Sequence, residues 1–523
     1  MGNYIEGKSR KQLFLLPPNL DDWVPEEHPA RAIDRFVDSL DTDSMELEEN
    51  NDSSGRKRYP PKEMIKILMY SYSIGVTSSR KIERLTHENV ALRWLSGSLH
   101  PDYRTIARFR RYNSNVLEGL LTKTVKLYRE AYLDEDNFDG VVFIDSTCIY
   151  ADANGDSFID EDKIRERVKK ILKEAERKDR EEDEKYGKDG SGDKLSDKSL
   201  EELDDIVRKL ADEANREIKE NREEKRENKE FAEKIDTLSR KINIYREEVE
   251  NNSDKKNRVS TTDPDARFMR HYSHGKQPSY RVEVSSDRNR VIMNFDAVKE
   301  CSDHHQLDDM VKGSELNLDN MVEIAVADKG YYNQDELESV LERDIIPVVK
   351  KEDHDKEKRK KGQFIRDDFE YNEERDIVVC PEGKELTYRF TYEMKGRKYR
   401  RYRLSSTICN KCPVKEKCIQ ARVEGGGKEG KNYSIQEDRS FINKHREIMK
   451  DEENLKLYDS RKETVEPIFG VIKRNLGFRR FNLRGHDNVR GEFGLIGAIY
   501  NLNKIINLMG FKEFINNIAF EGG

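Results

Sequence analysis

Three acidic side chains stand where this chain could build a metal-dependent site for cutting phosphodiester bonds. Asp145 and Asp328 each end a short apolar run, in FID and VAD, and Glu466 lies in the helix-like stretch RKETVEPIFGVIKRN. Two divalent ions about 4 Å apart can activate an attacking oxygen and stabilise a leaving oxygen. Because Mg²⁺ prefers carboxylate oxygens, about three convergent carboxylates on rigid elements are the minimum that a protein must supply.

Basic and aromatic residues accompany the third of these acids. Lys473 follows Glu466 by seven residues, which is two turns of an α-helix, so both side chains should share one face. Tyr458 and Arg461 precede Glu466 and fall on roughly the same side. A carboxylate that binds metal beside a lysine that binds phosphate would suit a DNA substrate.

Each acid also has a simpler interpretation. An aspartate that ends a strand often caps a turn or a helix. Asp152, Asp156 and Glu463 are rivals for the same roles. The three motifs are placed by independent strand and helix patterns, and their joint occurrence in order favours a shared site.

Several stretches of the chain carry a resemblance to a known family. FIDSTCIYADAN and VADKGYYN resemble the first-acid and second-acid strands of bacterial insertion-sequence transposases of the DDE class. RKETVEPIFGVIKRNLGFRRFNLRG resembles the signature around their third acid, and YPPKEMIKILMYSYSIGVTSSRKIERL is similar to the DNA-binding domain that precedes their catalytic core. The resemblance covers most of residues 15–150 and 260–510.

The resemblance implies an RNase H-like catalytic core that cleaves and transfers DNA strands at terminal inverted repeats. It implies that Asp145, Asp328 and Glu466 hold two Mg²⁺ or Mn²⁺ ions. It also implies that DNA ends are contacted by Tyr458, Arg461 and Lys473. Arg461 is one residue further from Glu466 than the usual spacing and Lys462 occupies the expected position, so either basic residue could contact phosphate.

The patterns around these motifs predict an α/β (α+β mixed) fold class. Residues 1–135 have short helical periods with turn signals between them, which suits a helix-turn-helix-like DNA-binding domain. Residues 136–155, 259–350 and 436–515 alternate strand and helix patterns, which predicts a mixed sheet flanked by helices. The arginines expected to contact DNA in the first segment are Arg104, Arg108, Arg110 and Arg111, and the alternative is a solvated helix face.

A highly charged segment, residues 156–258, interrupts the predicted core. Its apolar residues recur at spacings of three and four, which predicts a helical hairpin or coiled-coil insert. Two such stripes are present: Phe231, Ile235, Leu238, Ile242, Tyr245 and Val249, and Leu203, Val207, Leu210 and Ala214. We expect them to be structural or to form a dimer contact.

A second, basic insert at residues 351–435 contains four of the six cysteines. Cys409 and Cys412 have the spacing of a close ligand pair, and Cys380 and Cys418 could complete a tetrahedral Cys₄ zinc site. The 28 residues between Cys380 and Cys409 fit a β-hairpin with its own loop. The alternative is four reduced thiols in a loop.

The composition narrows the remaining possibilities. The net charge of the 523 residues is -8, but acidic residues gather at 156–254, so a basic DNA-binding surface is still possible. The sequence has no apolar run of 18 residues, no ATP-binding P-loop motif and no hydrolase elbow. Six cysteines do not form a disulfide framework, so we expect a cytoplasmic, nucleoid-associated protein.

Three functions fit these observations. The first is DNA transposition by a homodimer on DNA, since two transposon ends must be brought together. The second is a metal-dependent nuclease without strand transfer. The third is a catalytically inactive, domesticated DNA-binding protein, although the intact Asp145, Asp328, Glu466 and Lys473 argue against decay.

Overall fold

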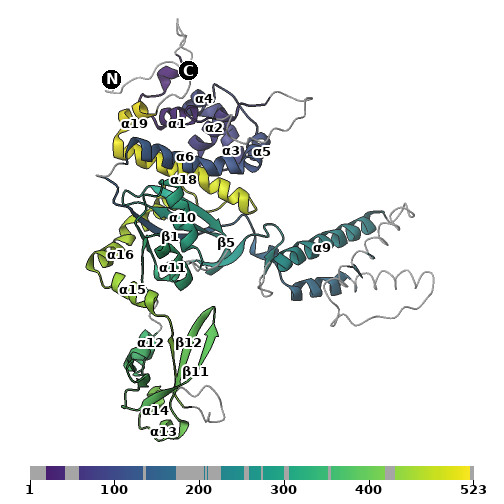
Figure 1. The fold of residues 1–523 in the computed structure, drawn as a ribbon. Helices are drawn as coiled ribbons and strands as arrows, with labels where there is room; N and C mark the ends of the chain where they lie inside the picture. Colours follow the sequence, from purple (N-terminus) through teal and green to yellow (C-terminus); the bar gives the residue numbers. More distant parts are fainter. Residues whose placement is uncertain are drawn as a thin grey trace, which may run out of the picture. The chain divides into compact units, whose positions relative to one another are not determined.

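The structure is a computed structural model with a mixed helix and strand content and several sheets (Figure 1). It describes residues 19–41, 58–133, 137–171, 173, 205–206, 209, 225–251, 258–271, 275–299, 305–351, 355–418 and 430–518. The chain forms two compact units. The first unit contains Met1–Asp303, Asp309–Val322 and Lys462–Gly523, and the second contains His304–Asp308 and Glu323–Arg461.

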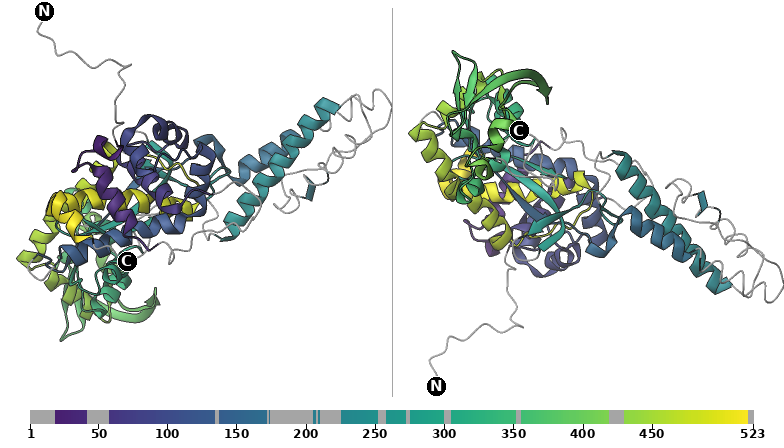
Figure 2. Two further views of the ribbon diagram at one scale, coloured as in Figure 1. Left: turned by 90° about the horizontal axis from the view of Figure 1, so that it is seen from above. Right: turned by 90° about the horizontal axis from the view of Figure 1, so that it is seen from below.

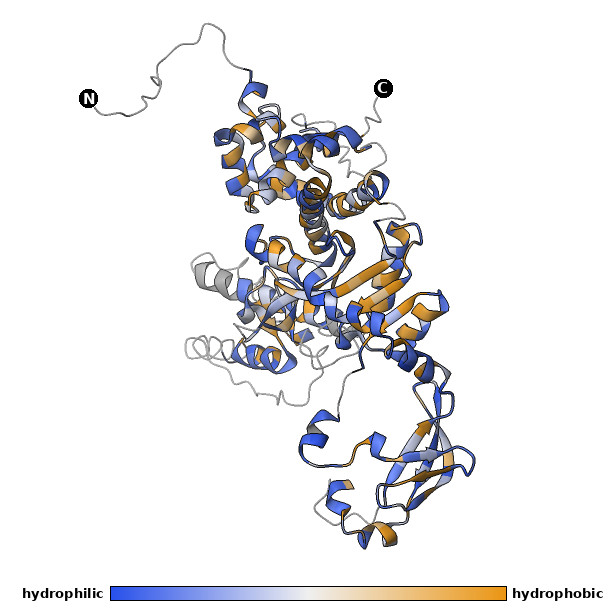
Figure 3. Ribbon diagram, turned by 90° about the vertical axis from the view of Figure 1, so that its left-hand side faces the viewer, coloured by the Kyte–Doolittle hydropathy of each residue, from blue (hydrophilic) through white to orange (hydrophobic). Residues whose placement is uncertain are grey.

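Short helices make up the N-terminal part of the first unit, as the sequence predicts. They are η1 (Asp21–Trp23), α1 (Pro29–Asp38), α2 (Pro61–Ser73), α3 (Ser79–Glu88), α4 (Val90–Leu95), α5 (Tyr103–Tyr112) and α6 (Ser114–Ala131). Most helices carry hydrophobic residues on one side and hydrophilic residues on the other (Figure 3). Side-chain caps set some boundaries, since Asn89 accepts from Leu92 N at 2.9 Å and Asp102 accepts from Thr105 N at 2.7 Å.

Antiparallel strands form the centre of the first unit. β1 (Val141–Tyr150) pairs with β5 (Gly275–Ser286), which also pairs with β4 (Arg267–His271) and β6 (Ile292–Val298). β5 and β6 follow one another in the chain and pair as an antiparallel hairpin. α10 (Leu307–Asn317) packs on this sheet, where Ser314 Oγ lies 2.6 Å from Ser285 Oγ.

Two long helices, α6 and α18 (His486–Met509), cover the sheet of the first unit and lie along each other (Figure 1). The short helix α19 (Phe511–Asn517) follows α18. The approach is close because Gly491, Gly494 and Gly497 face α6. A Cβ atom on Gly494 would stand only 2.4 Å from Glu118 Cα. The third-acid segment precedes α18 as α17 (Glu466–Gly470) and the π-helical turn η5 (Val471–Asn475).

The charged insert of the first unit begins and ends near a short pair of strands, β2 (Phe158–Ile159) and β3 (Val259–Ser260). Beyond them, residues 161–171 and α9 (Lys225–Asn251) are helical and run side by side in both views of Figure 2. The described part of the predicted stripe, Ile235, Leu238, Ile242 and Tyr245, is buried. The second stripe, from Leu203 to Ala214, lies outside the described residues.

The second unit begins with a strand–helix–strand motif. β7 (Ile324–Ala327) and β8 (Ile346–Val349) are parallel, and η3 (Lys329–Tyr331) and α11 (Gln334–Glu342) connect them. Parallel strands need such a crossover, and their apolar residues are largely buried. The unit continues through α12 (Lys356–Lys360) and η4 (Arg366–Asp368), and it ends with α15 (Ser440–Ile448) and α16 (Glu452–Thr464).

A five-stranded antiparallel sheet makes up most of the basic insert that the sequence predicts at residues 351–435. Its order is β13 (Asn432–Gln436), β12 (Arg397–Arg403), β11 (Glu385–Met394), β10 (Ile377–Val379), β9 (Glu370–Asn372). The predicted hairpin between the cysteines is β11–β12, whose turn uses positive φ at Lys395 and Gly396. α13 (Ser406–Asn410) and α14 (Lys415–Cys418) follow it.

Candidate active site

Asp145 lies in the middle of β1, opposite Val284 of β5. The four preceding residues, 141–144, are buried, and Asp145 itself is half-buried. Successive side chains of a strand point to opposite faces, so Asp145 and Thr147 share one face of the sheet. The apolar first half of β1 therefore fixes the position of a carboxylate at its partly accessible second half.

Lys473 contacts this same strand. Its Nζ donates to Thr147 Oγ1 at 2.5 Å and to the carbonyl oxygen of Cys148 at 2.9 Å. Burial lowers the pKa of Lys473. The chain beyond it stays on β1, because Tyr150 N donates to Arg479 O at 3.1 Å and Phe481 N donates to Tyr150 O at 2.9 Å. The structure thus brings the segment that carries the third acid against the strand that carries the first.

Glu466 is the first residue of α17, and its side chain is exposed. Pro467 lacks a backbone N–H and cannot bond to the carbonyl of Glu463, which explains the interruption at Val465 between α16 and α17. The sequence predicts an unbroken α-helix with Glu466 and Lys473 two turns apart. The π-helical turn η5 changes this spacing, and such turns are frequent at functional sites.

Asp328 belongs to the second unit, directly after β7. Its Oδ1 accepts from Tyr458 Oη at 3.2 Å and lies 3.5 Å from Arg461 Nη2. Burial, together with the neighbouring Asp328 carboxylate, raises the pKa of Tyr458 to about 12, so its hydroxyl stays protonated and donates. Two of the predicted DNA-end residues therefore hold the second acid in place.

Arg461 and Lys462 differ sharply in accessibility. Arg461 is 7% exposed and turned toward Asp328, whereas Lys462 is exposed. The sequence leaves open which of the two contacts phosphate. The structure gives Arg461 a positioning role for the second acid, and Lys462 is the residue of the pair that a DNA backbone could reach.

Lys350 is a residue of this region that the sequence does not single out. It follows β8 directly, and its Nζ lies 4.0 Å from the centre of the Tyr458 ring. Because β7 and β8 are parallel neighbours, Asp328 and Lys350 mark the same end of the two strands. The signal available in the sequence was the position of Lys350 directly after the apolar run IIPVV.

One predicted DNA contact on α5 is wrong. Arg110 is 4% exposed, and it donates to Tyr72 Oη at 2.5 Å, to Thr77 O at 2.8 Å and to Ser79 Oγ at 2.6 Å. Glu492 completes this buried network, with Oε1 accepting from Tyr72 Oη at 2.6 Å. A buried, paired guanidinium cannot reach DNA. The other three arginines, Arg104, Arg108 and Arg111, are exposed.

The rival carboxylates are placed differently from the main three. Asp152 forms an ion pair with Arg484 at 2.8 Å. Asp156 and Glu463 are exposed. Asp328, in contrast, contacts Tyr458 and Arg461, two of the predicted DNA-end residues.

Four cysteines converge in the second unit. A cavity of about 330 Å³ is lined by Cys380, Cys409, Cys412 and Cys418. Backbone amides donate to two of the sulfurs, from Lys384 N to Cys380 Sγ at 3.3 Å and from Lys431 N to Cys409 Sγ at 3.4 Å. Burial raises the pKa of the Cys418 thiol. The Cys₄ set predicted from spacing therefore shares one cavity.

In neither predicted metal site do the side chains already have the arrangement of a complete set of metal ligands. Within the described ranges, the side chains form no group of three or more His, Cys, Asp or Glu residues that could hold a metal ion. Asp145 and Glu466 lie in the first unit and Asp328 in the second. The carboxylate site and the thiol site thus stay predictions about the metal-loaded protein.

Two family models match the chain. One, described as a transposase DDE domain, matches residues 379–506, and the other, a transposase domain (DUF772), matches residues 18–112. The first match contains Glu466, Lys473 and the four cysteines, and the second contains α5. Asp145 and Asp328 lie outside both matched stretches. Comparison with curated proteins and with solved structures gave no match.

Proposed function

Both family matches support an insertion-sequence DDE transposase, and from this premise we propose that the chain cleaves transposon ends and transfers their strands to target DNA. The matched families indicate a role in DNA transposition, and the described part of the chain has no helix long and apolar enough to cross a membrane. The fold that we propose for the core is RNase H-like. The cellular location that we propose is the cytoplasm, on the nucleoid.

One observation supports the chemistry most strongly. Tyr458 and Arg461 come from a helix more than a hundred residues after Asp328, yet both point their polar atoms at its Oδ1. A carboxylate that must hold a metal ion needs its orientation fixed by neighbouring groups. Because both donors contact Oδ1, we propose Oδ2 as the metal-ligand position on Asp328.

Divalent metal ions are generally used by DDE transposases. Asp145, Asp328 and Glu466 are the residues that would hold two Mg²⁺ or Mn²⁺ ions. When bound, these ions would activate the attacking oxygen and stabilise the leaving oxygen. Lys473 shares the sheet face of Asp145 through its bond to Thr147, so its charge would lie beside the phosphate that is attacked.

The proposed reaction has two balanced steps. Water attacks the phosphodiester at a transposon end, the bond to the 3′ oxygen breaks, and a 3′ hydroxyl and a 5′ phosphate remain. The new 3′ hydroxyl then attacks a phosphodiester of the target, forming one bond to phosphorus while the target 3′ oxygen leaves. The proton of each attacking oxygen is taken up by solvent, and no nucleotide cofactor is consumed.

DNA recognition is assigned to the N-terminal helices. Arg104, Arg108 and Arg111 are exposed on α5, and the Tyr103 ring lies 5.0 Å from Arg80 and 5.7 Å from Arg104. We propose that this surface binds terminal inverted repeats, and that a homodimer brings two ends together. The basic side chains can neutralise phosphates regardless of the acidic total charge.

A structural Zn²⁺ in the second unit is a separate part of the proposal. The four cysteine side chains line one cavity, and two of their sulfurs already accept backbone N–H groups, as ligand thiolates commonly do. Cys409 belongs to a small buried core, and Cys380 and Cys418 pack against it. The seven members of this core are Phe369, Val378, Leu386, Tyr402, Leu404, Cys409 and Ile435. A bound ion would tie α13 and α14 to the β-sheet.

The test of the transposase is a cleavage assay with end-labelled inverted-repeat DNA and Mg²⁺. We expect strand cleavage and joined products from the wild-type protein, and a loss of at least a thousandfold in Asp328→Asn, since metal-held carboxylates carry most of the rate. Asp344→Asn is the matched control, because Asp344 is exposed in the same unit and asparagine tolerates its positive φ.

The outcomes separate the three functions. Cleavage without joined products would indicate a nuclease. DNA binding without cleavage would indicate an inactive DNA-binding protein. Equal cleavage by wild type and Asp328→Asn would remove Asp328 from the mechanism and contradict the proposed site.

A further inference from the structure

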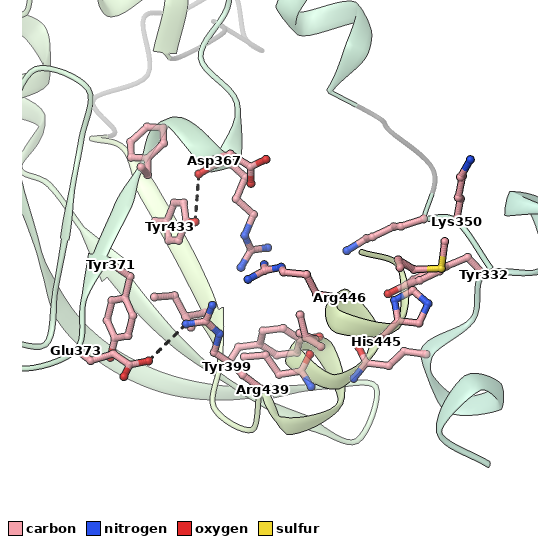
Figure 4. A pocket seen from close by; sticks show the side chains of 18 of the residues that line it. Tyr332, Lys350, Asp367, Tyr371, Glu373, Tyr399, Tyr433, Arg439, His445 and Arg446 are labelled. Atoms are coloured by element: carbon pink, nitrogen blue, oxygen red, sulfur yellow. Dashed lines mark hydrogen bonds and ion pairs between the residues drawn. The ribbon is translucent and has the colours of Figure 1, made fainter. Parts of the chain in front are cut away.

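A cavity of about 810 Å³ lies in the second unit (Figure 4). Its walls come from the residues that follow β7 and β8, from the sheet of β9, β12 and β13, and from α15 and the start of α16. Five basic residues line it: Lys350, Lys351, Arg366, Arg439 and Arg446. Asp367 and Glu373 are the carboxylates that oppose them. The lining is therefore positively charged and favours an anionic ligand.

Aromatic rings are interleaved with these charges. Tyr332, Tyr371, Tyr399 and Tyr433 line the cavity and are half-buried, so part of each ring stays accessible. The Arg366 guanidinium lies 5.2 Å from the centre of the Tyr433 ring, and Lys351 Nζ lies 5.6 Å from that of Tyr332. Flat rings edged by cations suit a ligand that has both a planar heterocycle and phosphates.

Two polar side chains of the lining have unused hydrogen-bonding capacity. His445 is 6% exposed, and its Nε2 has no hydrogen-bond partner among the described residues. Arg446 is exposed on the same helix, and Figure 4 shows its side chain reaching toward the strand that carries Tyr433. A buried polar atom without a partner is costly, so His445 indicates that a ligand group completes this wall.

The cavity is joined to the second acid by a short series of contacts. Lys350 Nζ lies 4.0 Å from the centre of the Tyr458 ring, and Tyr458 Oη lies 3.2 Å from Asp328 Oδ1. Tyr332 also follows Asp328 by only four residues. A strand held in the cavity would thus pass beside the carboxylate that we assign to the chemistry.

From these observations we infer that the cavity binds an unstacked nucleotide of a single DNA strand. The base lies against the tyrosine rings, and the phosphates on either side meet Arg439, Arg446 and Lys351. The inference rests on the proposed function, because it takes the DNA strand that Asp328 acts on as the ligand. Stacking on aromatic side chains beside a basic groove is the physical basis of single-strand binding in general.

The phosphate contact is tested by fluorescence anisotropy with the full chain and a labelled oligothymidylate of about 16 nucleotides. We expect Arg446→Gln to weaken binding and to reduce the slope of log K against log salt by about 0.7 for the lost phosphate contact. Lys444→Gln is the matched control, because Lys444 is exposed on α15 and does not line the cavity. Equal salt slopes for the two variants would overturn the phosphate contact.

The stacking contact is tested by Tyr399→Leu, which removes the aromatic ring and keeps an apolar side chain. We expect about tenfold weaker binding of the single strand and unchanged binding of a duplex of the same length. Phe390→Leu is the control, since Phe390 is 53% exposed on β11 and lies outside the cavity lining. Thermal unfolding of both variants checks that the sheet is intact.

Cleavage by the wild-type protein separates this inference from the proposed function. If the wild type cleaves DNA and Tyr399→Leu binds the single strand normally, the cavity inference is overturned and the transposase stands. If Tyr399→Leu loses single-strand binding while the wild type cleaves nothing, the cavity assignment stands and the transposase proposal fails. If Tyr399→Leu lost affinity equally for the single strand and the duplex, the assignment of an unstacked nucleotide to the cavity would be overturned.

Discussion

The core of the first unit and the β9–β13 sheet of the second unit are stabilised in different ways. In the first, α6 and α18 approach so closely that glycine is required at Gly494, and the first half of β1 is buried. In the second, β11 is exposed over most of its length and the buried core has seven residues. Extensive burial can hold the first region, and we expect a cross-link through the four cysteines to stabilise the second.

Removal of zinc is the strongest test of this difference in stabilisation between the two regions. Structural zinc sites can contribute about 10 kcal/mol to folding, so a chelator should unfold the β9–β13 sheet and leave α6 and α18 protected. Hydrogen exchange measured by mass spectrometry reports both regions in one sample. Cys409→Ser should act as the chelator does, and Cys148→Ser, in the first unit, should leave the zinc content unchanged. A purified chain without zinc and with a stable sheet would contradict the cross-link.

The buried Arg110 network should show the next largest effect. Removing one partner of a buried ion pair leaves an uncompensated charge on Glu492, so Arg110→Ala should lower the free energy of unfolding by about 3–5 kcal/mol. Arg111→Ala changes the exposed neighbour on the same helix and should cost less than about 0.5 kcal/mol. Urea denaturation of both variants measures the difference. Similar losses for the two would show that Arg110 is not buried in solution.

Asp287 should make the stability of the first unit depend on pH. Burial raises its pKa from 3.8 to about 6 in the folded protein. The folded state therefore holds this proton more tightly, and its contribution to stability is present below about pH 4 and is lost as the pH rises toward 6. The shift corresponds to about 3 kcal/mol, at about 1.4 kcal/mol per pKa unit.

Asp287→Asn should flatten the pH dependence of the melting temperature between pH 4 and 6, as scanning calorimetry would show. Asp156→Asn, at an exposed position in the same unit, should keep the wild-type dependence. Parallel curves for wild type and Asp287→Asn would mean that Asp287 ionises normally in the folded protein.

The helix contact at Gly494 should give the smallest effect of the four. A methyl group there would overlap backbone atoms of Glu118, so Gly494→Ala should destabilise by about 1–3 kcal/mol. Gly119→Ala, on α6, meets nothing within 4 Å and should stabilise by up to about 1 kcal/mol through helix propensity. We expect the melting temperature to fall in Gly494→Ala and to rise in Gly119→Ala. Stabilisation by both changes would show that α6 and α18 are not in close contact.

The sequence predicts the elements whose residues are patterned by burial. The strand that ends before Asp328 is confirmed, whereas the strand predicted to end at Asp145 continues to Tyr150. The helical periods of the N-terminal segment and of α9 are confirmed. Such elements can be predicted because the spacing of apolar residues along the sequence differs between strands and helices. The clustering of the four cysteines was expected from the ligand-pair spacing of Cys409 and Cys412, and all four line one cavity.

Features that depend on distant partners were not predictable. Arg110 looks like its neighbours on α5 until Tyr72 and Glu492 are known to face it. The strand β11 alternates apolar and polar residues, yet most of its side chains are exposed, so the pattern predicts the strand but not the absence of a buried face. The π-helical turn η5, which ends at Asn475, depends on hydrogen-bond geometry that residue types do not encode. In each case tertiary contacts decide between local alternatives.

The central claim is that Asp145, Asp328 and Glu466 together hold a pair of divalent ions. Mn²⁺ titration of the full chain, followed by electron paramagnetic resonance in the presence of DNA ends, tests it most directly. We predict about two tightly bound ions per chain, and loss of at least one in each of Asp145→Asn, Asp328→Asn and Glu466→Gln. Unchanged Mn²⁺ stoichiometry and affinity in all three variants would contradict the account.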